Sequence, residues 1–338
     1  MEQIRIGIIG FGFMGRTHLE AYRRAAATGL PCVVKKIFSF DDPTVSTGGN
    51  VDTGAADRLD LEAAAITASD SVEELLASKE IDLVSICTPT DTHVDLAIQA
   101  LKAGKHVLLE KPVALSCNEV QRLIEAHAGS RLLCMPAMCM RFWPGWSWLR
   151  QVVQENTLGP VVSASFQRFG AAPSWSQDFY LDEKRSGGAL TDLHVHDADF
   201  IVATFGMPDE ISTCGTRSQL VTQYRYEDGP ASVMAEAAWY PDPGYPFQMK
   251  YRVGFENCVA DFDLGREEDP LLLYRNGEKE VISLPQINGY DGEVRHLLEA
   301  IGRSDLDVLP DLREALRVSQ VLEAEARSLD EGCAISLQ

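Results

Sequence analysis

The sequence lacks several features that mark other classes of protein. No apolar run approaches the roughly 18 residues that a membrane-spanning helix needs, and there is no internal repeat or low-complexity segment. The eight cysteines are scattered and form no Cys-x-x-Cys pair, and several lie in apolar runs, where a free thiol acts as a small apolar group. The start, Met1–Arg5, has neither a basic region nor an apolar core of the kind found in signal peptides. We therefore expect a reduced, cytoplasmic globular protein.

Positive charge is also scarce. The chain has 30 basic and 50 acidic side chains, for a net charge of −20. A field of this sign repels nucleic acids and anionic membranes, so neither is an expected partner. A small molecule is the expected partner, and an anionic cofactor would have to be held by local geometry.

The first strong signal is glycine-rich. An apolar run, Ile4–Ile9, leads into Gly10-x-Gly12-x-x-Gly15, and a helical pattern follows over about 16–27. Strand, glycine turn and helix in this order are typical of dinucleotide binding. Gly10 would allow the tight turn, Gly12 the close approach of a pyrophosphate, and Gly15 the close packing of helix and strand. The alternative is a glycine-rich turn without a ligand.

The rest of the chain predicts two domains. Strand and helix patterns alternate over the first third, which indicates βαβ units and a parallel sheet. Helical stretches are expected at 61–65, 71–78 and 93–103. From about Cys134 the rhythm changes to successive strands with short connections, interrupted by one helix over about 189–205. We predict an α/β nucleotide-binding domain over 1–133 and an α+β domain with a mixed or antiparallel sheet over 134–338.

A residue at the end of the second strand would contact the adenosine ribose of a dinucleotide. An acidic residue there selects NAD, and a nearby arginine accommodates NADP. The candidates are Ser39, Asp41 and Asp42, of which Ser39 has the best position and is neutral. The two aspartates would repel a 2′-phosphate, so NAD is favoured and NADP stays possible.

Glu110-Lys111-Pro112 follows a further apolar strand, His106–Leu109. It should lie at the carboxyl edge of the sheet, where ligands of such sheets bind. The lysine offers a compact positive charge that can hold a substrate hydroxyl and lower its pKa. The alternative is a surface lysine at a strand end.

Asp192 and His196 are four residues apart in a predicted helix and would share one face. A carboxylate beside an imidazole raises the basicity of the imidazole, so the pair could take a proton from an alcohol. Two alternatives are a structural salt bridge and a metal site that adds His194 and Asp197. His194 and His196 lie on different faces of a helix, so no metal is expected.

These motifs together resemble the Gfo/Idh/MocA family, which includes glucose–fructose oxidoreductase and inositol dehydrogenase. The resemblance covers nearly the whole chain. It rests on the ordered set Gly10-x-Gly12-x-x-Gly15 with His18, Thr88-Pro89-x-x-x-His93, Glu110-Lys111-Pro112, Arg141-Phe142-x-Pro144 and Gly187-Gly188-x-x-x-Asp192-x-x-x-His196.

The resemblance implies a Rossmann domain, a C-terminal domain with a large open-faced, mostly antiparallel sheet, and a homodimer or homotetramer. It implies NAD or NADP as cofactor and hydride transfer at a secondary alcohol of a sugar or cyclitol. Lys111, Asp192 and His196 would be catalytic, with His196 as proton acceptor. The implied cofactor contacts are Gly10, Gly12, Phe13, Met14, Gly15, Ser39, Asp41, Thr88, Pro89, His93, Glu110 and Lys111. The implied substrate contacts are Lys111, Arg141, Trp175, Asp192, His194 and His196.

Three positions depart from the family pattern, the first being Ser186, where a third glycine before Ala189 is usual. His194 stands where a small residue is commoner, so it is expected to touch substrate. Ser39 stands where an acidic residue that binds the ribose hydroxyl is commoner. Two rival functions stay open at this point, namely glycoside cleavage with tightly held NAD on the same scaffold and a non-catalytic cofactor-binding regulator.

Overall fold

The computed structural model describes residues 2–42, 44, 49, 59–174, 177–180 and 182–337. The chain divides into two compact units, one made of Met1–Cys139 and Asn288–Leu316, the other of Met140–Ile287 and Arg317–Gln338. The first boundary therefore falls after Cys139, a few residues later than expected. No pattern in the sequence predicts that Asn288–Leu316 belongs to the first unit.

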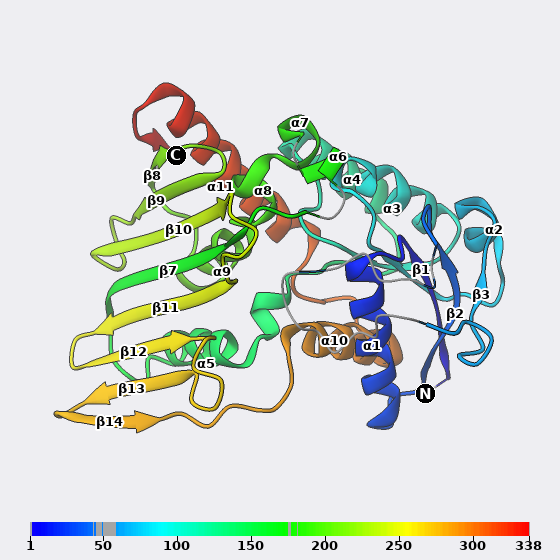
Figure 1. Cartoon of the computed structure of the whole chain (residues 1–338), viewed down its shortest axis with the longest axis horizontal. Coiled ribbons are helices and arrows are strands. Elements are labelled where there is room, and N and C mark those ends of the chain that lie inside the picture. Colours follow the sequence, from blue (N-terminus) through cyan, green and yellow to red (C-terminus); the bar gives the residue numbers. More distant parts are fainter. Residues whose placement is uncertain are drawn as a thin grey trace. The chain divides into compact units, whose positions relative to one another are not determined.

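The first unit is built on a six-stranded parallel sheet in the order β3-β2-β1-β4-β5-β6 (Figure 1). Its strand order reverses between β1 and β4, and ligands of such sheets bind beyond the carboxyl ends of the strands at this point. The predicted parallel α/β sheet is confirmed. The strands are β1 (Ile4–Ile9), β2 (Cys32–Phe38), β3 (Thr67–Ala68), β4 (Leu83–Ile86), β5 (His106–Leu109) and β6 (Cys134–Pro136).

Helices of the first unit begin at side chains that accept a backbone N–H. Ser71 accepts from Glu74 at the start of α2, and Ser116 accepts from Glu119 at the start of α4. The sequence analysis missed α4, and the helix expected at 61–65 is a turn. The helices are α1 (Phe13–Ala27), α2 (Val72–Ala77), the 3-10 turn η1 (Thr90–Thr92), α3 (His93–Lys102), α4 (Cys117–His127) and α10 (Gly289–Arg303).

Helix α10 belongs to the segment that returns to the first unit and packs against α1 (Figure 1). Asn288 and Asp291 form a capping box at its start. Arg24 of α1 donates to Asp291 at 2.7 Å, and Val294, Leu297 and Leu298 join the buried core of the unit. A stretch near the C-terminal end of the sequence thus completes the core beside the glycine turn.

The second unit contains a nine-stranded sheet in the order β14-β13-β12-β11-β7-β10-β9-β8-β15. Only β7 and β10 run parallel among its neighbouring strands, so the predicted mixed, mostly antiparallel sheet is confirmed. The strands are β7 (Val161–Ala171), β8 (Glu210–Gly215), β9 (Gln219–Arg225), β10 (Ser232–Tyr240), β11 (Gln248–Phe255), β12 (Cys258–Asp263), β13 (Leu271–Arg275), β14 (Glu278–Val281) and β15 (Ile335–Ser336).

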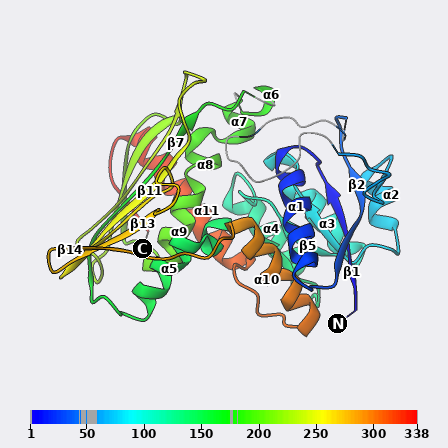
Figure 2. The same cartoon turned by 60° about the horizontal axis from the view of Figure 1, so that its bottom comes forward.

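One face of this sheet is covered by α5, α9 and α11 (Figure 2). Trp146 of α5 is fully buried and packs its ring against Phe166, Phe200 and Tyr251. The remaining helical elements are η2 (Cys139–Phe142), α5 (Pro144–Gln154), α6 (Gln177–Tyr180), α7 (Glu183–Ser186), α8 (Gly188–Asp192), α9 (Val195–Phe205) and α11 (Leu312–Glu331). In the part of the chain that the structure describes, no helix has the length and apolar character needed to cross a bilayer.

Candidate active site

The turn after β1 requires glycine at two positions. Gly10 has a φ of +87°, and a Cβ there would lie 2.6 Å from the carbonyl oxygen of Cys87 and 2.9 Å from Cγ2 of Thr88. A Cβ on Gly15 would lie 2.2 Å from the carbonyl oxygen of Gly10. The tight turn at Gly10 and the close packing at Gly15 are confirmed. The chain after β4 thus lies directly against the glycine turn, at the point where the strand order reverses.

The helix that follows presents its N-terminus at this turn. Helix α1 begins at Phe13, its N-cap residue is Gly12, and its first turn has no acidic side chain. The first N–H groups of a helix have no acceptor within the helix, and the helix dipole adds positive potential there. The N–H groups of Phe13 and Met14 belong to this first turn. This end of α1 therefore fits the pyrophosphate of a dinucleotide.

The residues expected to contact the adenosine ribose follow β2. Its last residue, Phe38, accepts a hydrogen bond from Gly10 N–H at 2.9 Å, so Ser39 lies next to the glycine turn. Ser39 is half-buried and Asp41 is exposed. The carboxylate of Asp42 accepts from the backbone and hydroxyl of Thr44, which together hold the pKa of Asp42 below its usual value. Ser39 and Asp41 stay the candidates for ribose contact.

A buried histidine ties two loops of the first unit together. The Nδ1 of His93 lies 2.8 Å from the carbonyl oxygen of Pro112, and its Nε2 lies 2.8 Å from that of Thr88. The ring is 1% exposed, and burial lowers the pKa of His93. Both nitrogens face backbone carbonyls, so neither is left for a nucleotide. His93 braces the loop of Thr88 and Pro89 instead of contacting a cofactor through its ring nitrogens.

Glu110 and Lys111 have different surroundings. The Glu110 carboxylate is buried, where it lies 3.0 Å from His18 Nε2 and accepts from the backbone N–H of Lys111 at 3.0 Å. Its expected cofactor contact is therefore not favoured. Lys111 is half-buried, lies two residues beyond the end of β5, and is joined to Pro112 by a cis peptide bond. The position expected for Lys111 at the carboxyl edge of the sheet is confirmed.

The stretch with Asp192 and His196 is less regular than the sequence predicts. The expected single helix is divided into α8 and α9, because the chain makes a turn at Leu193 and His194. The backbone N–H of His194 reaches back to Ala189 at 2.8 Å, a wider turn than that of an α-helix. Asp192 and His196 are both half-buried on either side of this break. Their catalytic roles stay predictions.

His194 lies in a different environment from these two residues. Its side chain is fully buried, with Nε2 lying 3.0 Å from the hydroxyl of Tyr224 and 3.2 Å from Glu325. Tyr224 donates to the other Glu325 oxygen at 2.6 Å. Burial lowers the pKa of His194, but the charge and hydrogen bond of Glu325 outweigh it, and the net shift is upward. The expected contact of His194 with substrate is not supported, because the ring is enclosed within the second unit.

Two further buried ion pairs involve residues that the sequence suggested as substrate or metal contacts. Arg141 is 4% exposed and donates to Asp199 through Nε and Nη2, at distances down to 2.6 Å. Arg168 pairs in the same way with Asp197 at 2.8 Å. The ion pair with Asp199 does not favour the expected substrate contact of Arg141. Of the alternative metal ligands, Asp197 pairs with Arg168 and His194 lies beside Glu325. Trp175 lies outside the described residues.

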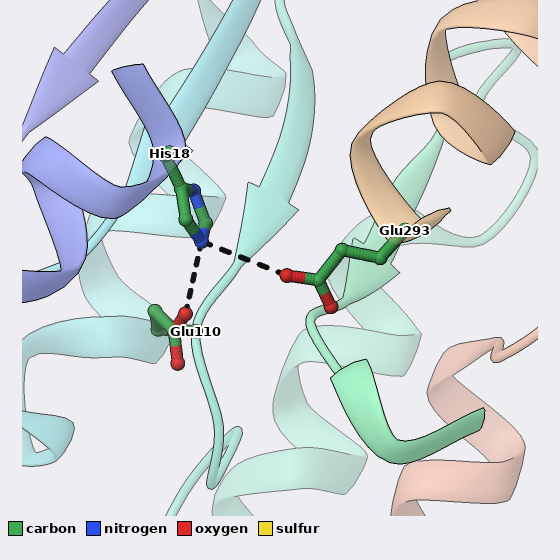
Figure 3. A group of neighbouring side chains, drawn as sticks. All are labelled: His18, Glu110 and Glu293. Carbon is green, nitrogen blue, oxygen red and sulfur yellow. Dashed lines mark hydrogen bonds and ion pairs between the residues drawn. The ribbon is translucent and has the colours of Figure 1, made fainter. Parts of the chain in front are cut away.

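One buried group was missed by the sequence analysis. His18, Glu110 and Glu293 converge in the first unit, from α1, the end of β5 and α10 (Figure 3). They are far apart in sequence, and only the packing of α10 against α1 brings Glu293 to the other two. The motif signal included His18 and Glu110 but not Glu293.

Comparison with known proteins decides the family. Residues 4–138 match the family model described as the oxidoreductase family with an NAD-binding Rossmann fold. Residues 146–240 match the model of the GFO/IDH/MocA C-terminal domain. The chain belongs to the Gfo/Idh/MocA family. The resemblance inferred from the ordered motifs is thereby confirmed, as is the Rossmann domain that it implied.

Named relatives of this Gfo/Idh/MocA protein include two dehydrogenases. Levoglucosan dehydrogenase of Pseudarthrobacter phenanthrenivorans is 27% identical over 59% of this chain, and the match spans 50% of that protein. The scyllo-inositol 2-dehydrogenase (NAD(+)) of Bacillus subtilis is 23% identical over 99% of this chain and 97% of its own length. A solved structure of levoglucosan dehydrogenase in complex with NADH and levoglucosan has a TM-score of 0.83 at 18% identity, covering 99% of this chain and all of that one. The structural likeness establishes the shared fold.

Proposed function

We propose that this protein is an NAD-dependent oxidoreductase that transfers hydride between nicotinamide and a secondary alcohol or ketone of a sugar, sugar derivative or cyclitol. The observation that carries the proposal is the match of both halves of the chain to one oxidoreductase family. The two named relatives supply the substrate class, since one acts on an anhydrosugar and the other on an inositol.

The first unit has the features that an NAD site needs. Gly10 and Gly15 allow the turn to lie close to α1, and the N-terminus of α1 suits a pyrophosphate. A neutral Ser39 beside the turn, followed by exposed Asp41, favours a ribose hydroxyl over a 2′-phosphate. NAD, when bound, supplies the hydride acceptor.

The roles of the other residues follow from their chemistry. Lys111 would orient the reacting oxygen and stabilise negative charge that develops on it. His196 would take the hydroxyl proton, and Asp192 would orient the imidazole and raise its basicity. General base catalysis of this kind contributes about 10²–10⁴-fold to rate. Asp192 and His196 remain partly accessible, whereas His194 and Asp197 beside them are buried in ion pairs.

The protein would act as a homodimer or homotetramer. Strand β10 alternates buried and more exposed side chains, and the more exposed face of the sheet carries Met234 and Tyr274, which are 39% and 43% exposed. A second copy of this chain is the occupant we propose for that face. Sedimentation velocity tests it, with Met234→Glu expected to shift the protein to monomer.

A cytoplasmic setting is also proposed. All eight cysteines are free thiols, and several of them are buried as small apolar groups. A reducing compartment suits this composition.

The experiment compares His196→Ala with His127→Ala, a histidine on α4 outside the proposed site. Turnover of NAD is measured with levoglucosan, myo-inositol and scyllo-inositol, and NADH affinity by fluorescence titration. We expect His196→Ala to lose about 10²-fold or more of the turnover with unchanged NADH affinity, and His127→Ala to keep both. Equal turnover by His196→Ala and the wild type would remove His196 from the mechanism. NAD that survives dialysis, without net NADH production, would instead indicate glycoside cleavage.

A further inference from the structure

Three buried side chains of the first unit point at one another, and one of them has no hydrogen-bond partner. His18 Nε2 lies 3.0 Å from Glu110 Oε1 and 3.8 Å from Glu293 Oε1 (Figure 3). One ligand atom from each side chain lies within 4.8 Å of the others. The side chain of Glu293 is 0% exposed, and neither of its oxygens has a hydrogen-bond partner among the described residues. A fully buried carboxyl group without a hydrogen bond is costly, so this arrangement needs an explanation.

Glu110 and Glu293 differ in their partners. Glu110 lies 3.0 Å from His18 Nε2 and accepts from the backbone N–H of Lys111. Glu293 has no such hydrogen bond at either oxygen among the described residues. A buried polar group left without a partner costs about 1–3 kcal/mol.

A divalent cation would give the buried Glu293 carboxylate a partner. Two carboxylates and one divalent ion are neutral together, and a neutral imidazole adds a third ligand without changing the charge. In tetrahedral coordination with bonds of about 2.0 Å, neighbouring ligand atoms lie about 3.3 Å apart. The distances of 3.0 and 3.8 Å from His18 Nε2 bracket this value. We propose that His18, Glu110 and Glu293 form a binding site for a divalent first-row transition metal such as Zn²⁺.

The surroundings of His18 favour Nε2 as the ligand atom. Its other ring nitrogen, Nδ1, lies 3.5 Å from the sulfur of Cys87. An N–H at Nδ1 can donate to that sulfur, which leaves the Nε2 lone pair directed at the cation. Imidazole together with carboxylates suits Zn²⁺ or Mn²⁺ better than Mg²⁺ or Ca²⁺.

The ion would have a structural role that does not depend on the proposed dehydrogenase activity. It would link α1, the end of β5 and the returning helix α10. Glu110 also accepts from the backbone N–H of Lys111, so the same ion would hold the start of the Lys111–Pro112 turn.

Equilibrium dialysis with Zn²⁺ tests the site. The full-length protein is first stripped with a chelator, and bound metal is then measured by mass spectrometry. The test variant is Glu293→Gln, which keeps the shape of the side chain but removes its charge. The matched control is Glu299→Gln, a more exposed glutamate on the same helix. His18→Asn serves as a second test variant, and circular dichroism checks the folding of each.

We expect one tight equivalent of Zn²⁺ in the wild type and in Glu299→Gln. Glu293→Gln and His18→Asn should bind at least about tenfold more weakly, since even outer-shell partners of a metal change its affinity about 10–100-fold. Co²⁺ in place of Zn²⁺ should give visible absorption bands in the wild type that are lost in Glu293→Gln. Absence of a tight equivalent in the wild type, or equal binding by all four proteins, would overturn the proposal.

Discussion

Replacing Gly10 with alanine tests the geometry of the glycine turn most sharply. The new Cβ would lie 2.6 Å from the Cys87 carbonyl oxygen, so it must retreat by roughly 0.8 Å to reach ordinary contact. The positive φ costs an L-residue about 1–2 kcal/mol. Overpacking adds about 1–3 kcal/mol. We therefore expect a loss of roughly 2–5 kcal/mol in unfolding free energy.

Gly104 provides a matched control in the same unit. Its φ is +77°, but a Cβ there meets nothing within 4 Å. Gly104→Ala should therefore lose only the unfolding free energy that the positive φ costs, about 1–2 kcal/mol. The difference between the two variants isolates the contact with the chain after β4.

Stability and NADH binding are measured in separate assays. All five tryptophans lie between 143 and 239, so their fluorescence reports only the second unit. Urea unfolding is therefore followed by circular dichroism, which also detects the helices of the first unit. NADH affinity is measured by the fluorescence of the nucleotide itself. Gly10→Ala should weaken NADH at least about tenfold, equivalent to about 1.4 kcal/mol, while Gly104→Ala leaves it unchanged. Equal losses of stability in the two variants would refute the close approach of the turn to Cys87.

Three further predictions concern the buried polar groups. His93→Ala should lose about 2–5 kcal/mol of stability in urea titrations, because it opens a cavity and removes the N–H that the imidazole donates to the carbonyl of Pro112 or Thr88; a loss below about 1 kcal/mol would argue against the brace. The pKa of His194 is raised above 6.5 in the folded protein, so the stability it contributes is present below that pH and is lost as the pH rises through the folded pKa. Glu325→Gln should flatten this alkaline decline in urea midpoints, and an unchanged slope would contradict the pairing. Arg141→Met should cost about 3–5 kcal/mol by leaving the Asp199 carboxylate buried alone, and Arg141→Met/Asp199→Leu should recover most of it; no recovery in the double variant would count against the ion pair.

The parts of the site that the sequence predicted are those set by local rules. Gly10 and Gly15 could be assigned because a strand, a tight turn and a helix in sequence leave little choice of backbone conformation. The position of Lys111 followed from an apolar strand and the edge at which parallel strands end. The alternation of apolar residues similarly placed most strands of the second unit.

The parts that it did not predict depend on long-range packing. His194 and Arg141 belong to motifs and look functional in sequence, yet both are buried in ion pairs whose partners, Glu325 and Asp199, lie far along the chain. Glu293 reaches His18 only because a late helix returns to the first unit. Periodicity and local motifs carry no information about such partners.

Deuterium transfer is the most direct test of the central claim, hydride transfer from a secondary alcohol to NAD. Levoglucosan, myo-inositol and scyllo-inositol, each deuterated at the carbinol carbons, are incubated with the protein and NAD, and NADH is analysed by mass spectrometry. The account predicts that at least one compound yields NADH carrying one deuterium at the nicotinamide ring. NADH without deuterium, or a protein that binds NADH but forms none from any of the three, would contradict it.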